Sequence, residues 1–167
     1  LMLETRLRQA LMADEFVLHY QPLIHARSGR IFGVEALVRW QPPGKPMVPP
    51  GKFIPIAEET GLIVPLGEWV LRTACAQGRA WMDAGLPPLV IAVNLSVRQF
   101  RSENVVELTR RVLAETRLPA DCLELELTES MFMEHAEQSI ETLKTLKSLG
   151  VHLAIDDFGT GYSSLTY

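Results

Sequence analysis

The sequence predicts an α/β fold built around a parallel sheet. Segments with the pattern of strands alternate with segments of helical periodicity, and the strands are apolar enough to be covered on both faces. The chain has 167 residues, of which 47% are hydrophobic and 22% charged, as expected for one globular domain. The pattern leaves two architectures open, an open doubly wound sheet or a closed (β/α)8 barrel.

The first third of the chain contains one helix, two strands and one long loop. Leu3, Leu7 and Leu11 recur at helical spacing. We expect a helix over residues 3–11, a strand over 16–21 that Pro22 stops, a second strand over 31–40, and a loop over the five prolines of residues 41–51.

From residue 65 onward, helices and strands alternate. Pro65 suits the first turn of a helix, and glycines at 85 and 150 suit positions just after helices. We expect helices over residues 65–84, 102–116 (with Ser102 as N-cap) and 134–149, and strands over 89–95, 123–127 and 151–155.

Charge and cysteine content exclude several functions. The formal net charge is −4, with 16 basic against 20 acidic side chains, so no broad cationic surface is available for duplex nucleic acid. Cys75 and Cys122 lie far apart and outside any metal-binding spacing, which indicates buried thiols rather than a disulfide or a zinc site. No apolar stretch approaches the ~20 residues of a membrane span.

Polar residues recur at the carboxyl ends of the predicted strands. Asn94, Glu126 and the pair Asp156-Asp157 each follow an apolar run. In α/β folds these strand ends meet at the edge of the sheet where ligands bind. Strand parity places Asn94, Glu126 and Asp156 on one face, which we infer to be the barrel interior, and Glu35 joins them from the second strand.

Clustered carboxylates raise one another's pKa unless a cation lies between them. An all-oxygen donor set without cysteine suits Mg²⁺ or Mn²⁺, and a pair of such ions is a known device for phosphodiester hydrolysis. Each residue also has a structural interpretation. Glu124 and Glu126 can be solvated strand residues, Asn94 a turn former, and Asp156-Asp157 a helix cap.

Six segments resemble, in order, those of the EAL domain family of cyclic di-GMP phosphodiesterases. They are Tyr20-Gln21-Pro22, Val34-Glu35-Ala36-Leu37-Val38-Arg39-Trp40, Phe53-Ile54-Pro55 with Ala57-Glu58, Asn94-Leu95-Ser96, Glu126-Leu127-Thr128-Glu129-Ser130, and the run from Asp156-Asp157-Phe158-Gly159 to Leu165. The resemblance implies a TIM-like (β/α)8 barrel with an antiparallel first strand, of which this chain supplies roughly five strands. Residues 1–167 would form a single EAL domain, truncated at its C-terminus.

The resemblance also implies roles for particular residues. Metal ligands would be Glu35, Asn94, Glu126, Asp156 and Asp157, holding two Mg²⁺ or Mn²⁺ ions. Substrate contacts would be Gln21, Leu37 and Arg39, while Glu129 would anchor the loop that starts at Asp157. Glu35, Asp156, Asp157 and Glu129 form the catalytic set. Together they would hydrolyse one phosphodiester bond of cyclic di-GMP, giving linear pGpG.

The alternative is a receptor that binds cyclic di-GMP without cleaving it. Such family members usually lose metal ligands or the loop motif, and both are kept here, so we favour the enzyme. The chain stops at Tyr167, short of the ~250 residues of a TIM-type barrel. We therefore expect three strands to be missing, together with a lysine, a metal-binding glutamate and a glutamine, and the isolated fragment to be inactive.

The resemblance extends to the cellular setting. It implies sensory or cyclase domains elsewhere in the parent protein, a homodimer formed near the loop after Asp157, and a cytoplasmic site of action unless other domains anchor the protein to a membrane. From the residues alone we add one hypothesis. His152 and Glu124 point inward low on their strands, and we expect them to form a buried, hydrogen-bonded pair beneath the metal site.

Overall fold

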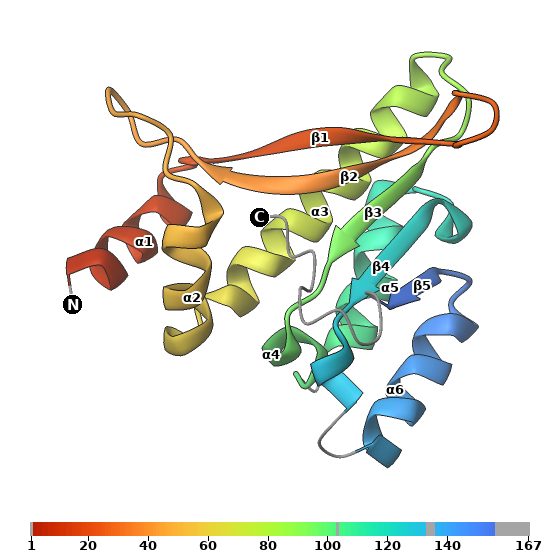
Figure 1. Ribbon diagram of the computed structural model, residues 1–167. Coiled ribbons are helices and arrows are strands. Elements are labelled where there is room, and N and C mark those ends of the chain that lie inside the picture. The colour runs from red at the N-terminus through yellow and green to blue at the C-terminus, as the bar shows by residue number, and fades with distance from the viewer. Residues whose placement is uncertain (1, 103, 133–135, 156–167) are drawn as a thin grey trace.

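The protein is built around one five-stranded sheet, described here from a computed structural model covering residues 2–102, 104–132 and 136–155. The strands are β1 (Phe16–Ile24), β2 (Ile31–Trp40), β3 (Val90–Asn94), β4 (Leu123–Leu127) and β5 (His152–Ile155), in that spatial order (Figure 1). β1 and β2 form an antiparallel hairpin, and every later pairing is parallel. The predicted α/β class with an antiparallel first strand is confirmed.

The strands are connected by helices in regular alternation. These are α1 (Met2–Met12), α2 (Pro50–Thr60), α3 (Ile63–Asp83), α4 (Val97–Phe100), α5 (Val105–Thr116) and α6 (Ala136–Ser148), with short 3-10 turns η1 (Ala120–Cys122) and η2 (Glu129–Phe132). No helix in the described ranges is both long enough and apolar enough to cross a membrane.

The main core lies between the sheet and helices α3, α5 and α6. Alternate residues of β2, β3 and β4 face these helices, and their side chains are almost fully buried. They include Val34 and Ala36 of β2, Ile91 and Val93 of β3, and Leu123, Leu125 and Leu127 of β4. The other face of the same strands is therefore left to carry the polar residues.

A second core, rich in aromatic residues, packs α1 and α2 against the ends of β1 and β2. The Phe53 ring lies 5.6 Å from Phe16 and 6.0 Å from Trp40, measured between ring centroids. Leu7 of α1 is fully buried in the same cluster. This packing fixes α2 over the carboxyl end of β2, which is the end that bears the candidate site (Figure 1).

Glu15 joins α1 to the end of β2 through charge-assisted hydrogen bonds. The Trp40 indole Nε1 donates to Glu15 Oε2 at 2.9 Å, and Arg6 donates to both carboxylate oxygens at 3.0 and 3.1 Å. The Trp40 hydrogen bond is the main cause of a lowered pKa of Glu15, with Arg6 adding to it against the opposing effect of burial. An ionised carboxylate is thus favoured in this part of the second core.

Three details of the predicted elements are wrong. Pro22 does not stop β1, which continues to Ile24. β1 is an edge strand, and a proline is tolerated there because its missing N–H donor can fall on the side that has no neighbouring strand. The loop over residues 41–51 is shorter than predicted because Pro50 begins α2. Ser102 is not the N-cap of α5, which begins at Val105 after the separate helix α4.

Candidate active site

Three of the predicted ligands lie next to one another on one face of the sheet: Glu35 in the middle of β2, Asn94 at the end of β3 and Glu126 near the end of β4. Glu35 pairs in register with Ala92, and Asn94 pairs with Glu126. Asn94 Nδ2 donates a hydrogen bond to Glu35 Oε1 at 3.0 Å. Glu35 and Asn94 are 59 positions apart in the chain, and the parallel pairing places their side chains in direct contact.

The β1–β2 hairpin adds the predicted substrate contacts to the same face. Gln21 lies directly opposite Glu35 in the antiparallel register and is exposed. Leu37 is buried, and Arg39 is half-buried with Nη1 donating to the backbone oxygen of Val38 at 2.9 Å. Gln21 therefore lies beside Glu35, whereas the Arg39 guanidinium donates a hydrogen bond to the backbone of its own strand.

β4 supplies two more predicted residues. Glu126 is half-buried, and its backbone oxygen accepts a hydrogen bond from the Leu95 N–H at 2.9 Å. Glu129 begins η2 immediately after the strand and is also half-buried. Asp156 and Asp157, the remaining predicted ligands, lie outside the described residues, as does the loop that Glu129 was predicted to anchor.

The described donors fit a hard divalent cation. Glu35 and Glu126 offer carboxylate oxygens and Asn94 an amide oxygen, the ligand types that Mg²⁺ and Mn²⁺ prefer. The Asn94 Nδ2 is engaged with Glu35, so the amide oxygen is the atom of Asn94 suited to a cation. Within the described residues, no three His, Cys, Asp or Glu side chains form a group that could hold a metal.

A narrow cleft of about 50 Å³ lies beside Asn94, and no feature of the sequence predicted it. Leu37, Glu58, Asn94, Ser96 and Gln99 are among the residues that line it. Burial raises the pKa of Glu58, which α2 carries into the cleft wall. Glu58 belongs to one of the six segments that resemble the EAL family, and nothing else in the sequence indicated that it lies near the site.

The expected buried pair of His152 and Glu124 is wrong. The two residues are register partners on β5 and β4, but His152 is exposed and Glu124 only half-buried. No hydrogen bond joins them in the part of the chain that the structure describes. β5 is the edge strand of the described sheet, so His152 has a neighbouring strand on one side alone and water reaches its ring.

Comparison with known proteins agrees with this geometry. The EAL domain family model matches residues 4–167. The bifunctional diguanylate cyclase/cyclic di-GMP phosphodiesterase MucR of Pseudomonas aeruginosa is 50% identical over 161 residues, which cover 96% of this chain and 24% of MucR. The cyclic di-GMP phosphodiesterase PdeR of Escherichia coli K12 is 44% identical over 166 residues, covering 99% of this chain and 25% of PdeR.

A solved structure of PaMucR phosphodiesterase in complex with c-di-GMP superposes with a TM-score of 0.91 at 50% identity, covering all of this chain and 68% of that chain. The shared fold confirms the expected TIM-like architecture, to which the described residues contribute five strands. The chain spans about a quarter of the length of MucR and of PdeR. Its sequence and its fold both place it in one family: the chain belongs to the EAL domain family.

Proposed function

We propose that this chain is the first part of a domain that hydrolyses one phosphodiester bond of cyclic di-GMP to linear pGpG with two Mg²⁺ or Mn²⁺ ions. The observation that supports the proposal most is the contact of Glu35 on β2 with Asn94 at the end of β3, beside Glu126. The names of MucR and PdeR, and the c-di-GMP complex of PaMucR, support the substrate.

In this proposal the described residues hold and orient the reacting groups. Glu35, Asn94 and Glu126 would hold the first ion, with Asp156 bridging to the second and Asp157 completing it. The ions, when bound, would polarise the phosphate and lower the pKa of the attacking water. Asn94 fixes one carboxylate oxygen of Glu35 through its Nδ2 hydrogen bond, which leaves the other oxygen for a cation.

The substrate would be held from the β1–β2 hairpin. Gln21 stands across from Glu35, and Leu37 and Arg39 lie on the same strand face, so all three can reach a ligand bound at the cluster. Arg39 would exchange its bond to the Val38 carbonyl for a phosphate oxygen, to which a guanidinium can donate two N–H groups. Glu129 would anchor the loop that begins at Asp157.

The test uses protein containing the complete domain, incubated with cyclic di-GMP and Mg²⁺ or Mn²⁺. Wild type should release pGpG, and Glu35→Ala should reduce turnover roughly 100-fold or more, since even the outer partners of metal ligands contribute 10–100-fold. Glu124→Gln is the matched control, because this carboxylate lies on the same face of β4 as Glu126 but two residues lower.

Two outcomes would refute the enzyme. One is the absence of linear product from wild type at saturating metal, and the other is equal turnover by wild type and Glu35→Ala. Tight binding of cyclic di-GMP without turnover would instead establish the receptor. We expect no turnover by the isolated 167 residues, because the family resemblance implies a lysine and a further metal-binding glutamate that are not among them.

A further inference from the structure

The turn that follows Asn94 is fixed by hydrogen bonds from two directions. On one side the Leu95 N–H donates to the backbone oxygen of Glu126 at 2.9 Å. On the other side Ser96 and Gln99 form a reciprocal capping box at the start of α4. Ser96 Oγ accepts from the Gln99 N–H at 3.1 Å, and the Ser96 N–H donates to Gln99 Oε1 at 3.0 Å.

The Gln99 side chain is buried in a notch on α3. It is a polar side chain with only 6% of its surface exposed. The notch exists because residue 67 of α3 is glycine: a Cβ there would lie 1.6 Å from Gln99 Nε2 and 2.2 Å from Gln99 Cδ. Glycine within a helix lowers the stability of the helix by about 1 kcal/mol relative to alanine. Gly67 therefore destabilises α3 slightly but allows the Gln99 side chain to approach the helix closely.

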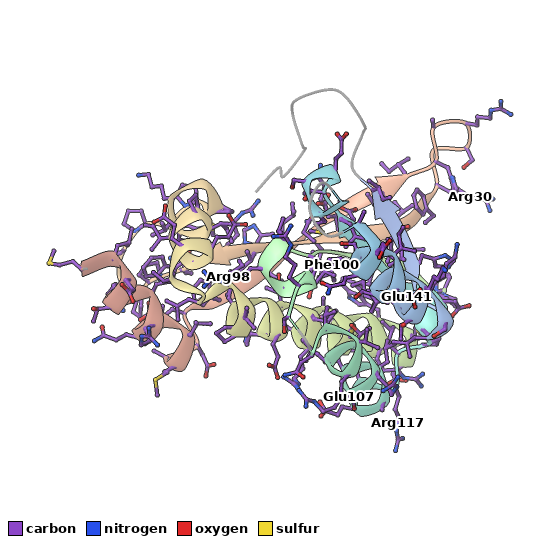
Figure 2. All side chains as sticks on the ribbon, turned by 90° about the horizontal axis from the view of Figure 1, so that it is seen from below. Arg30, Arg98, Phe100, Glu107, Arg117 and Glu141 are labelled. Carbon is purple, nitrogen blue, oxygen red and sulfur yellow. The ribbon has the colours of Figure 1, made fainter. Side chains whose placement is uncertain are left out.

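Arg98 ties the same short helix to α2. Its Nη1 donates to the backbone oxygens of Glu58 and Glu59 in the last turn of α2, the latter at 3.1 Å. Carbonyls in the last turn of a helix lack intrahelical partners, which Arg98 here supplies. Figure 2 shows Arg98 between α2 and α4. α4 therefore contacts α2 through Arg98 and α3 through Gln99.

We propose that Gln99, seated against Gly67, is a positioning residue for Asn94. The inference rests on the proposed function, in which Asn94 is a ligand and also holds Glu35. Asn94 is separated from the capping box only by Leu95, so the box sets the direction in which β3 delivers the Asn94 side chain. Removing the Gln99 side chain would take away the acceptor of the Ser96 N–H, which is the half of the box nearer to Asn94, and the contact of Asn94 with Glu35 would loosen.

A purely structural role makes a different prediction. A capping interaction contributes about 1 kcal/mol to stability, and its loss would lower the melting temperature alone. A positioning role also changes metal affinity at temperatures where the protein is fully folded. Outer groups that orient metal ligands typically contribute 10–100-fold to affinity or activity.

The experiment compares Gln99→Met with Gln99→Glu in protein containing the complete domain. Methionine fills the notch without an acceptor for the Ser96 N–H, whereas glutamate keeps that acceptor and is the usual residue of a capping box. Mn²⁺ binding is measured by calorimetric titration at 20 °C and turnover of cyclic di-GMP is measured in parallel. We expect Gln99→Met to weaken Mn²⁺ binding about 10-fold and to lower kcat, and Gln99→Glu to restore both.

Gly78→Ala is the matched control for strain on the same helix. Its Cβ would lie 2.7 Å from Ile91 Cγ1, a side-chain atom on the helix-facing side of β3. This variant should lose stability but keep the Mn²⁺ affinity of wild type, whereas Gly67→Ala should lose both because it displaces Gln99. Mn²⁺ affinity of Gln99→Met within twofold of wild type, or an equal loss in Gly78→Ala, would overturn the inference.

The result separates the two proposals. A wild-type protein that binds Mn²⁺ but releases no pGpG refutes the proposed reaction, while the ranking of the Gln99 variants by Mn²⁺ affinity still decides the positioning role. A wild-type protein that turns over normally alongside an equally active Gln99→Met refutes the positioning role alone. Absence of Mn²⁺ binding by wild type contradicts both.

Discussion

The backbone of β3 lies close against Gly33 of β2, and Gly33→Ala tests how the site is supported. Gly33 pairs in register with Val90, and a Cβ at residue 33 would lie 2.5 Å from the Val90 backbone oxygen and 2.9 Å from Val90 Cβ. A backbone oxygen cannot rotate away as a side chain can. The strands must separate by about 0.5 Å before the contact reaches 3.0 Å, the shortest that real Cβ atoms adopt.

The expected cost follows from this overlap. Overpacking of a well-packed site destabilises by about 1–3 kcal/mol, and replacing glycine returns about 0.4–1 kcal/mol by restricting the unfolded chain. The net loss therefore lies between about 0 and 2.6 kcal/mol with a midpoint of about 1.3 kcal/mol, which for a domain of this size lowers Tm by roughly 3–5 °C. Glu35 lies two residues beyond Gly33, so strand separation should also stretch the Asn94–Glu35 hydrogen bond and reduce turnover.

The assay is thermal unfolding of protein containing the complete domain, followed by circular dichroism, with Gly51→Ala as the control. Gly51 lies in α2, and a Cβ there would have no neighbouring atom within 4 Å, so alanine should leave Tm unchanged or raise it. A Tm for Gly33→Ala equal to or above that of Gly51→Ala would refute the argument, because the close approach of the strands would then carry no energetic consequence.

Two further predictions concern the second core. Phe53→Ala should destabilise by about 3–5 kcal/mol and Phe53→Leu by much less, measured by urea unfolding, because Phe53 is fully buried against Phe16 and Trp40; equal losses in the two variants would contradict a cavity as the cause. The Trp40 hydrogen bond and Arg6 lower the pKa of folded Glu15 below 4.5, so its contribution to stability is present above pH 4.5 and is lost as the pH falls through the folded pKa. The difference in Tm between wild type and Glu15→Gln should therefore shrink between pH 7 and pH 3, and a constant difference would exclude the charge of Glu15 as its origin.

The sequence pattern predicted the sheet well and the short helices poorly. The strands over 31–40 and 123–127 have the predicted bounds, because continuous apolar runs and alternating parity are local signals. α4 has only four residues, too few for helical periodicity, and its capping box depends on Gln99 reaching back to Ser96. α2 begins with Pro50, which suits a first helical turn, but it also contains Pro55, and an internal proline ordinarily argues against a helix.

The candidate site, too, was predicted only in part from the sequence. The strand-end rule correctly placed Asn94 and Glu126 together, and strand parity correctly added Glu35 from the middle of β2, whatever the chemical role of the three residues. The rule gives the face of a residue but not its surroundings. His152 has the predicted parity and is nevertheless exposed, because burial depends on what covers an edge strand. The Gly67 notch likewise required α3 and α4 to be placed against each other.

The arrangement makes β3 the strand on which the candidate site depends most. Asn94 bonds to Glu35 on β2 and pairs with Glu126 on β4, and the following Leu95 N–H bonds to the Glu126 backbone. A displacement of β1 changes the position of Gln21 relative to Glu35. A displacement of β3 changes the position of Asn94 relative to both Glu35 and Glu126. Substitutions that move the end of β3 should therefore impair the site more than equally destabilising substitutions on β1. The reason is that Glu35 on β2 and Glu126 on β4 are both aligned through their contacts with β3.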